Sequence, residues 1–310
     1  MMIDGAAPMS RDARTPGTVS ATGSLWVRLA MLLGLLVPAA GLAGDVTPRA
    51  DVQFVPLNPL RGDASPQAGA LWGNIRKDTP TGAIIVFKPN FSSPPHIHNI
   101  TYRGVVIEGV VHNDDPGAEK LWLGPGSFWV QPAGEPHITA AGEDGATIFL
   151  EILSGPYLVR PTDEAFDSGD RPLNVDATNL VWLTGSDTAW IKTPSEPKAG
   201  GPAIAHLWGG PGQGEQNGTL LRLPSGFRGE PKSASDSINA VVIVGRLALS
   251  DMPPSALLKP GAFLQFEQDD PQPLACEGEE ACQLYLSTTG PYRLTETAEA
   301  MMEEAGGSRP

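Results

Sequence analysis

Three histidines at two places in the chain have the spacing of metal ligands. His96 and His98 are separated by one residue and follow a pair of prolines, and His137 ends a proline- and glycine-rich segment at 132–137. In an extended strand, side chains two residues apart lie on the same face, so His96 and His98 can present two imidazoles to one point. His137 can reach that point from a later strand. Imidazole nitrogens bind divalent transition metals, and iron, zinc, manganese, nickel and copper all remain open.

Other residues near these motifs have simpler interpretations. His112 and His206 have no partner at ligand spacing, and we predict that hydrogen bonds within the fold satisfy them. Glu135 is close to His137 in sequence but falls in a turn, where a carboxylate is usually solvated, so it does not qualify as a general base.

Short β-strands must position the three histidines. Glycine (36) and proline (31) are abundant, and beyond the N-terminal region no stretch keeps the 3.6-residue period of an amphipathic helix. We predict an antiparallel sandwich or small barrel whose interior receives the histidines. The predicted strands of the first half are 83–88, 94–98, 102–108, 120–123, 127–131 and 147–153. The predicted apolar lining of its interior is Phe87, Val106, Phe128, Val130, Phe149 and Ile152.

An internal repeat organises the chain after residue 65. The leucine-tryptophan-glycine segment at 71–73 recurs at 207–209, and the apolar stretch 105–109 recurs at 241–245, both 136 residues later. Gly155-Pro156-Tyr157 recurs in the same way at 290–292. This pattern predicts two copies of one β domain, at 48–162 and 172–295, with a polar connector between them and a C-terminal tail at 296–310.

The second copy has lost the candidate metal ligands. At the repeat offset, the three histidines fall on Lys232, Ala234 and Gln272, and these side chains do not make a transition-metal site. We therefore predict a structural role for the second copy, either packing against the first or forming the contact of a homodimer.

The first histidine pair and its surroundings resemble the first motif of the cupin superfamily. That motif runs glycine, five residues, His-x-His, three or four residues, glutamate, six residues and glycine. Asn90 stands at the first glycine, His96 and His98 match, Tyr102 stands at the glutamate and Gly109 closes the motif.

The second cupin motif is met at 126–141. Gly126, Pro132, Gly134 and His137 match it, and Ala141 takes the place of its asparagine. The likeness extends through both copies and is closest to two-domain (bicupin) proteins grouped as a family of unknown function. It implies an all-β protein of two tandem jelly-roll, or double-stranded β-helix, domains, with a three-histidine metal site in the first and a degenerate second domain.

Tyr102 departs from the family pattern, which places a carboxylate on the metal. An unperturbed tyrosine has a pKa near ~10, so only direct metal contact would ionise it. We predict instead that Tyr102 lines the pocket and, together with Arg103, positions a substrate.

Two classes of function remain open. In the first, the protein is a metal-dependent enzyme acting on a small organic molecule, as an oxygenase or as a lyase or isomerase. In the second, it binds a small ligand or senses a metal without catalysis, for which the cupin domain of zinc-binding anti-sigma factors is a precedent by analogy only.

The N-terminal region has the pattern of a secretory signal peptide at residues 1–43. Arg28 precedes an apolar or small-residue run at 29–43 that ends in residues suited to a signal peptidase. A membrane-spanning helix needs about 20 apolar residues, so we expect cleavage and no stable span afterwards, with a retained anchor as the alternative. The mature protein would then be periplasmic or secreted.

Charge and cysteine content narrow the partners and the compartment. The formal net charge of −14 disfavours nucleic acid and anionic lipid surfaces, which leaves a small-molecule ligand or substrate. Cys276 and Cys282 enclose an acidic loop, and in an oxidising compartment we expect a disulfide between them. A thiolate metal pair or a redox couple is the alternative, but the spacing is not Cys-x-x-Cys and no histidine lies near.

Overall fold

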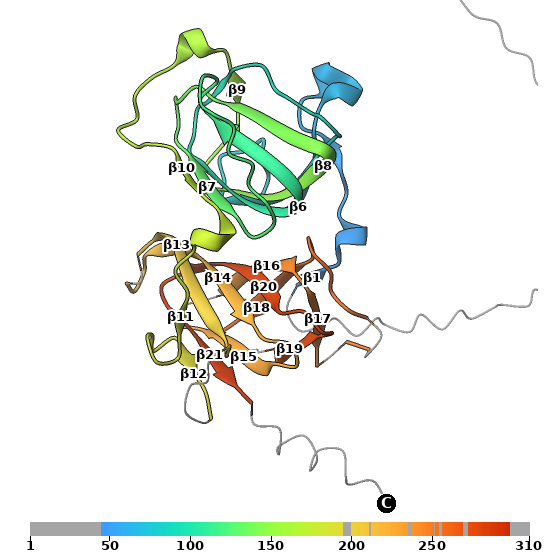
Figure 1. The fold of residues 1–310 in the computed structure, drawn as a ribbon, viewed down its shortest axis with the longest axis vertical. Helices are drawn as coiled ribbons and strands as arrows, with labels where there is room; N and C mark the ends of the chain where they lie inside the picture. The colour runs from blue at the N-terminus through green and yellow to red at the C-terminus, as the bar shows by residue number, and fades with distance from the viewer. Residues whose placement is uncertain are drawn as a thin grey trace, which may run out of the picture. The chain divides into compact units, whose positions relative to one another are not determined.

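A computed structural model describes residues 45–194, 200–210, 212–234, 237–250, 252–253, 256–268 and 272–297 (Figure 1). The predicted signal peptide and nearly all of the predicted tail lie outside these residues. Within them the chain is almost entirely β, as predicted, and its helices are short 3₁₀ turns. These turns are η1 (Arg49–Asp51), η2 (Pro59–Ala64), η3 (Thr162–Glu164) and η4 (Ala177–Asn179). No helix in the described part of the chain is long and apolar enough to cross a membrane.

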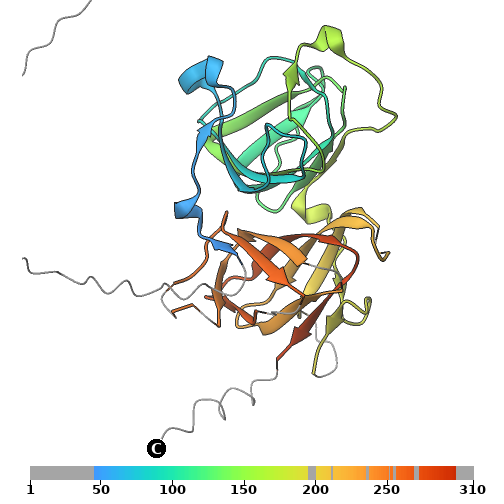
Figure 2. The same cartoon turned by 180° about the vertical axis from the view of Figure 1, so that it is seen from behind.

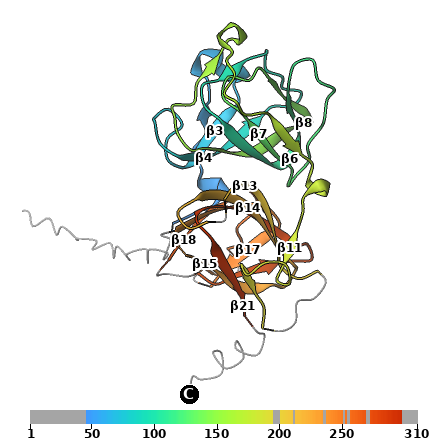
Figure 3. The same ribbon diagram turned by 90° about the vertical axis from the view of Figure 1, so that its left-hand side faces the viewer.

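The histidine motifs lie among the strands of a seven-stranded antiparallel sheet, whose main strands are labelled in Figure 3. Its order is β10-β7-β6-β8-β4-β3-β2. The strands are β2 (Val55–Pro56), β3 (Gln67–Trp72), β4 (Thr81–Phe87), β6 (Tyr102–Asp114), β7 (Phe128–Gln131), β8 (Ile138–Ile152) and β10 (Leu173–Val175). A separate two-stranded sheet pairs β5 (Ile97–His98) with β9 (Val159–Arg160).

The second half contains a seven-stranded and a five-stranded sheet (Figures 1 and 2). The larger sheet has the order β1-β18-β16-β20-β14-β13-β11 and the smaller one β12-β21-β15-β19-β17. The larger sheet comprises β1 (Val46–Thr47), β11 (Leu183–Thr184), β13 (Ala203–Gly209), β14 (Gln216–Leu223), β16 (Ser237–Val244), β18 (Phe263–Glu267) and β20 (Cys282–Thr289). The smaller one comprises β12 (Ile191–Lys192), β15 (Arg228–Ser233), β17 (Arg246–Leu249), β19 (Leu274–Glu277) and β21 (Tyr292–Glu296).

The two large sheets share a strand order. The order β3-β4-β8-β6-β7 in the first half has the counterpart β13-β14-β20-β16-β18 in the second, and this supports our proposal of an internal duplication. Both sheets are extended by strands from elsewhere in the chain, because β1 pairs with β18 and β10 pairs with β7. The boundaries at 48–162 and 172–295 stay predictions.

Some strands differ in length from those predicted. Strands β6 and β8 are much longer than 102–108 and 147–153, because they pair along most of their length through two irregularities near Glu108 and Gly109. The predicted strand 120–123 contributes only an isolated bridge from Leu123 to Val111. The predicted strand 94–98 is reduced to Ile97–His98, since the two preceding prolines cannot donate to a ladder.

Alternation along the strands divides the apolar residues between two faces. One face of the first sheet encloses a core that includes Phe87, Val106 and Ile152, as predicted. Phe128, Val130 and Phe149 lie on the other face, where they join a cluster that also contains residues of the second half. The prediction that these three line the interior is therefore wrong, because each is displaced by one residue from the inward-facing register.

Candidate metal centre

The main chain brings His96 and His137 directly opposite each other. They form an isolated antiparallel bridge in which each N–H donates to the other's carbonyl, at 3.0 and 2.9 Å. His98 lies two residues further along, and its carbonyl accepts from the N–H of Gly134 at 2.8 Å. Gly134 has φ of +80°, a conformation that favours glycine. The second motif thus holds the first one in place.

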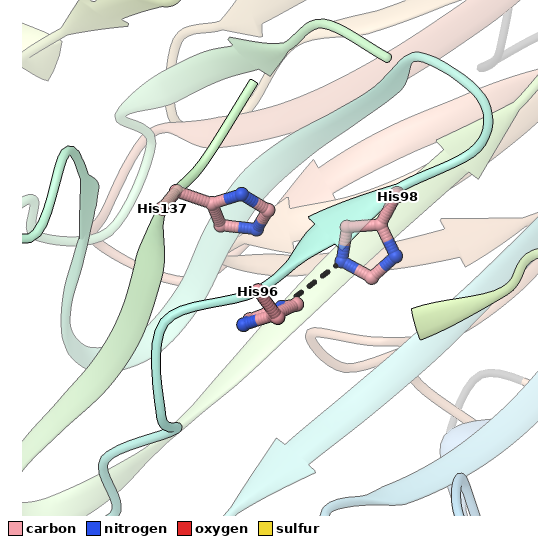
Figure 4. A group of neighbouring side chains, drawn as sticks. All are labelled: His96, His98 and His137. Carbon is pink, nitrogen blue, oxygen red and sulfur yellow. Dashed lines mark hydrogen bonds between the residues drawn. The ribbon is translucent and has the colours of Figure 1, made fainter. Parts of the chain in front are cut away.

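The three imidazoles converge on one point (Figure 4). Their ligand nitrogens all lie within 4.8 Å of one another, and His96 Nε2 is 3.1 Å from His98 Nε2. Two nitrogens that bind one metal at about 2.1 Å, at an angle of about 90–110°, are separated by about 3.0–3.4 Å. The observed spacing fits two ligands of a single ion.

The other nitrogen of each ring fixes the tautomer. The Nδ1 atoms of His96, His98 and His137 lie 2.9, 3.0 and 3.1 Å from the carbonyl oxygens of residues 94, 158 and 135. A carbonyl only accepts, so each Nδ1 carries the proton and each Nε2 presents a lone pair. Two facing lone pairs at 3.1 Å cannot hydrogen-bond to each other. The donor set therefore fits a metal ion, whose histidine ligands usually have their second nitrogen fixed in this way.

Burial keeps the three rings neutral, which is the form that binds metals. Desolvation lowers the pKa of His96, and it lowers the pKa of His98 well below 6.5, with the neighbouring His137 and His96 adding to the effect. Burial, with His96 nearby, lowers the pKa of His137 to about 3. The cluster consequently has no proton to lose at neutral pH before a cation can bind.

Tyr102 lies at the cluster, as predicted. Its hydroxyl is 3.3 Å from His137 Nε2 and donates to Asn113 Oδ1 at 2.8 Å. Burial raises the pKa of Tyr102, which keeps it a neutral phenol. The described cluster of metal-ligating side chains therefore contains the three histidines and no carboxylate.

Arg103 does not lie at the cluster, and the prediction that it positions a substrate there is wrong. It follows Tyr102 on β6, so its side chain leaves the opposite face of the strand. There its Cζ lies 4.0 Å from the ring centroid of Trp208, and Glu151 and Tyr285 are its electrostatic neighbours.

Tyr157 is a site residue that sequence reasoning missed. Its hydroxyl is 3.0 Å from His98 Nε2, and its ring stacks on that of His98 with centroids 4.1 Å apart and planes at 24°. The repeated Gly-Pro-Tyr segment marks this residue in the sequence, but 59 positions separate it from His98. Only the pairing of β5 with β9 brings the two together.

A buried amide network supports the cluster and was also missed. Asn113 accepts from Thr139 Oγ1 at 2.7 Å as well as from Tyr102, and it donates to Gln131 Oε1 at 2.9 Å. Gln131 then donates to the carbonyl of Glu135 at 3.2 Å, the same carbonyl that receives His137 Nδ1–H. The network links both sides of the His137 environment.

A cavity of about 340 Å³ opens beside His96 and His98. Tyr102, Tyr157 and Trp129 line it close to the histidines. The remaining wall is largely apolar and includes Leu57, Ile85, Phe87, Phe91, Ile148 and Leu150. Its size and lining are those of a small-molecule site.

The second half lacks a comparable site among the described residues. Lys232 and Ala234 are exposed, Gln272 is buried, and apolar side chains fill the interior. One potential metal cluster occurs in the described part of the chain, and it is the one in the first half. Cys276 and Cys282 form a disulfide between β19 and β20.

The antiparallel jelly-roll sheets and the buried three-histidine cluster define a cupin-type protein whose histidines fit a metal ion. More particularly, the chain belongs to the family described as "Domain of unknown function (DUF4437)", whose model matches residues 45–295. The comparison with curated proteins gave no match.

Solved structures are similar in fold. An inferred dioxygenase from Nostoc punctiforme is 14% identical, with 81% of this chain and 81% of that chain aligned at a TM-score of 0.56. The 7S globulin of Momordica charantia is 11% identical, with 80% of this chain and 85% of that chain aligned at a TM-score of 0.52. At these identities the similarity shows the fold alone.

Proposed function

We propose that this protein is an exported enzyme that binds one divalent transition metal through His96, His98 and His137 and acts on a small organic molecule in the adjacent cavity. The observation that carries the proposal is the set of three Nε2 lone pairs directed at one point, each fixed by a carbonyl on the opposite ring nitrogen. Oxygenase-like chemistry and lyase- or isomerase-like chemistry are both compatible with an open three-histidine centre.

When bound, the metal would polarise a substrate oxygen or, if it is iron, activate dioxygen. The chain's own residues supply orientation and exclusion of water. The apolar wall removes the substrate from solvent, which strengthens polar interactions within the cavity. Once His98 Nε2 holds a metal it no longer accepts a proton, and the Tyr157 hydroxyl is then free to donate to a substrate oxygen. The Tyr102 hydroxyl stays fixed by Asn113.

Metal content of protein purified without an affinity tag tests the site. We expect stoichiometric metal in the wild type and its loss in the double variant His96→Ala/His98→Ala. The matched control is His206→Ala, since that histidine packs against Trp190 in the second half and lies outside the cluster. Unchanged metal in the double variant, or equal loss in the control, contradicts the proposed centre.

Oxygen-uptake screening with small carbonyl and phenolic compounds tests the reaction. Iron accompanied by substrate-dependent uptake supports an oxygenase. Stoichiometric zinc with no turnover of any compound would favour the alternative, a protein that captures a small ligand without catalysis.

Export is the remaining part of the proposal. It rests on the signal-like pattern at 1–43, and the Cys276–Cys282 disulfide is compatible with an oxidising compartment. Mass spectrometry of the mature N-terminus, after expression with the full leader, should show cleavage near residue 43. An intact leader on cytoplasmic protein would contradict it.

A further inference from the structure

We infer that the ligand of this cavity is a carboxylate with an apolar body, and that Arg61 binds the carboxylate group. The inference rests on the proposed function insofar as it takes the cavity beside the histidines to be the substrate site. Arg61 lies on the short turn η2, and it lines the same cavity as His96 and His98.

A self-closed loop presents Arg61. At its base, Leu57 N–H donates to the carbonyl of Pro66 at 2.9 Å, and Asn58 N–H donates to Ser65 Oγ at 2.9 Å. Within it, the N–H of Leu60 donates to Asn58 Oδ1 at 3.0 Å. The backbone that carries Arg61 is therefore held by its own hydrogen bonds, and the guanidinium does not depend on a neighbour to define its place.

The charge of Arg61 is available to a ligand. Among the described residues, no acidic side chain forms an ion pair with it, whereas Arg49, Arg160, Arg171 and Arg228 each have one. Its guanidinium carbon lies 6.0 Å from the ring centroid of Phe91, another lining residue. It is also close enough to the cluster for its positive charge to contribute to the lowered pKa of His96.

The cavity has the opposite charge to the protein around it. The chain carries 35 acidic and 21 basic residues, yet no aspartate or glutamate is among the residues that line the cavity. Arg61 is the one arginine or lysine in that lining. A cationic group in an apolar cavity attracts an anion, and the long-range field of an acidic protein makes such a local exception selective.

The number of cations favours a carboxylate over a phosphate. One guanidinium pairs in planar, bidentate fashion with a single carboxylate, whereas a dianionic phosphate ester would leave a second charge without a basic partner. The apolar wall then accommodates the body of the ligand, and about 340 Å³ is enough for one aromatic ring or a short alkyl chain. The substrate class is therefore an aryl or alkyl carboxylate.

Calorimetric titration with matched pairs of compounds tests this inference. The probes are benzoate and phenylacetate, each against its neutral amide, added to zinc-loaded protein. We expect the carboxylates to bind more tightly than the amides, and Arg61→Gln to weaken carboxylate binding by about tenfold or more while leaving the amides within about twofold. Arg61→Lys should weaken it less, because the charge remains but the planar fork is lost.

The control is Arg76→Gln, which removes the same charge from an exposed position of the same half that does not line this cavity. Equal effects of Arg61→Gln and Arg76→Gln overturn the inference, and so does the absence of saturable carboxylate binding by the wild type up to the solubility limit.

Repeating the titration in His96→Ala/His98→Ala protein separates the two proposals. A persisting effect of Arg61→Gln in that background supports the anion site independently of the metal. If the wild type also lacks metal, the metal centre fails while the anion site stands. If the wild type holds metal but Arg61→Gln changes nothing, the anion site fails while the metal centre stands.

Discussion

Two tyrosine hydroxyls lie beside the histidine cluster, and their hydrogen bonds give them different roles. The Tyr102 hydroxyl donates to Asn113 Oδ1, which also accepts from Thr139. The Tyr157 hydroxyl contacts His98 Nε2, the atom that a metal would take. Tyr102 is therefore part of the support of the cluster, and Tyr157 is the hydroxyl that a bound metal would release toward a ligand.

Replacing Tyr157 by phenylalanine should separate metal binding from ligand binding. The three imidazoles remain and the ring can still stack on His98, so we expect stoichiometric metal. Affinity for a bound carboxylate, or turnover once a substrate is known, should fall by about tenfold, the effect of one lost hydrogen bond to a charged group. Elemental analysis and calorimetry measure the two effects.

Tyr292→Phe is the matched control, because Tyr292 occupies the repeat position and its buried hydroxyl bonds to Thr219. It should leave metal and ligand binding unchanged. Loss of metal from Tyr157→Phe would instead make the phenol a ligand.

The residues found from sequence and those missed differ in how far apart their contacts are along the chain. His96 and His98 are two residues apart on one strand, and a motif at a set distance supplied His137. Tyr157 and Arg61 reach the same site through loop closures that no local period records. Arg103 was misplaced because adjacent residues on a strand face opposite sides, so nearness in sequence to Tyr102 counted against it.

At the level of elements, the pairing of β6 with β7 depends on a missing side chain. Gly104 pairs with Trp129, and a Cβ on Gly104 would lie 2.1 Å from the indole ring. The Trp129 side chain is fully buried and lines the cavity. The ring thus covers the space that any larger residue at 104 would occupy.

Gly104→Ala should therefore destabilise the first half. We expect the free energy of unfolding to fall by about 1–3 kcal/mol, as for other overpacked cores, with a shift in tryptophan emission as the indole moves. Urea denaturation gives the first quantity. Gly124→Ala, where an added Cβ meets nothing within 4 Å, should change neither, and equal effects of the two variants would refute the packing argument.

The segment that follows β1 is attached to the first sheet by one ion pair. Arg49 Nη1 donates to Glu108 Oε1 at 2.6 Å, and Thr147 Oγ1 donates to the other oxygen of Glu108 at 3.1 Å. The hydrogen bond from Arg49 lowers the pKa of Glu108 below its ordinary value of 4.5. Since the Glu108 side chain is half exposed, solvent screens the pair and its contribution is less than about 1 kcal/mol.

The stabilisation from Glu108 should depend on pH in a defined direction. A carboxyl whose pKa is lower in the folded state stabilises the fold above its unfolded pKa, and the effect disappears as the pH falls through the folded value. Glu108→Gln should thus lower the free energy of unfolding by about 0.5 kcal/mol at pH 7 and by nothing measurable near pH 3. The control Glu143→Gln, at an exposed position of β8, should show no such trend. A difference from wild type that persists undiminished at low pH would exclude the ion pair as its source.

Lengths of strands were harder to predict than their existence. The apolar core of β6 is evident in the sequence, but its extension to Asp114 passes through Glu108 and Gly109, where the alternation of polar and apolar residues breaks. Bulges of this kind depend on the partner strand β8, which a local pattern does not contain.

At the level of the molecule, one core cluster contains residues from both halves. It joins Val105, Phe128 and Phe149 to Val241 and Tyr285. A buried polar contact accompanies it, since the Tyr285 hydroxyl accepts from Trp208 Nε1 at 2.8 Å and donates to Glu151 Oε2 at 2.5 Å. Burial raises the pKa of Glu151, and Tyr285 is the first of the hydrogen-bond donors that offset this rise. The stability of one half is therefore coupled to the other.

Tyr285→Phe should weaken both halves together. It leaves the Glu151 carboxyl without its tyrosine donor and Trp208 Nε1 without its acceptor, and we expect a loss of about 2–4 kcal/mol in the free energy of unfolding. Metal release reports on the first half, and accessibility of the Cys276–Cys282 disulfide to reductant reports on the second. Because the core cluster is shared, both reports should move to the same lower urea concentration in the variant and coincide in the wild type. Disulfide exposure that shifts while metal release stays at its wild-type midpoint would show that the halves unfold independently.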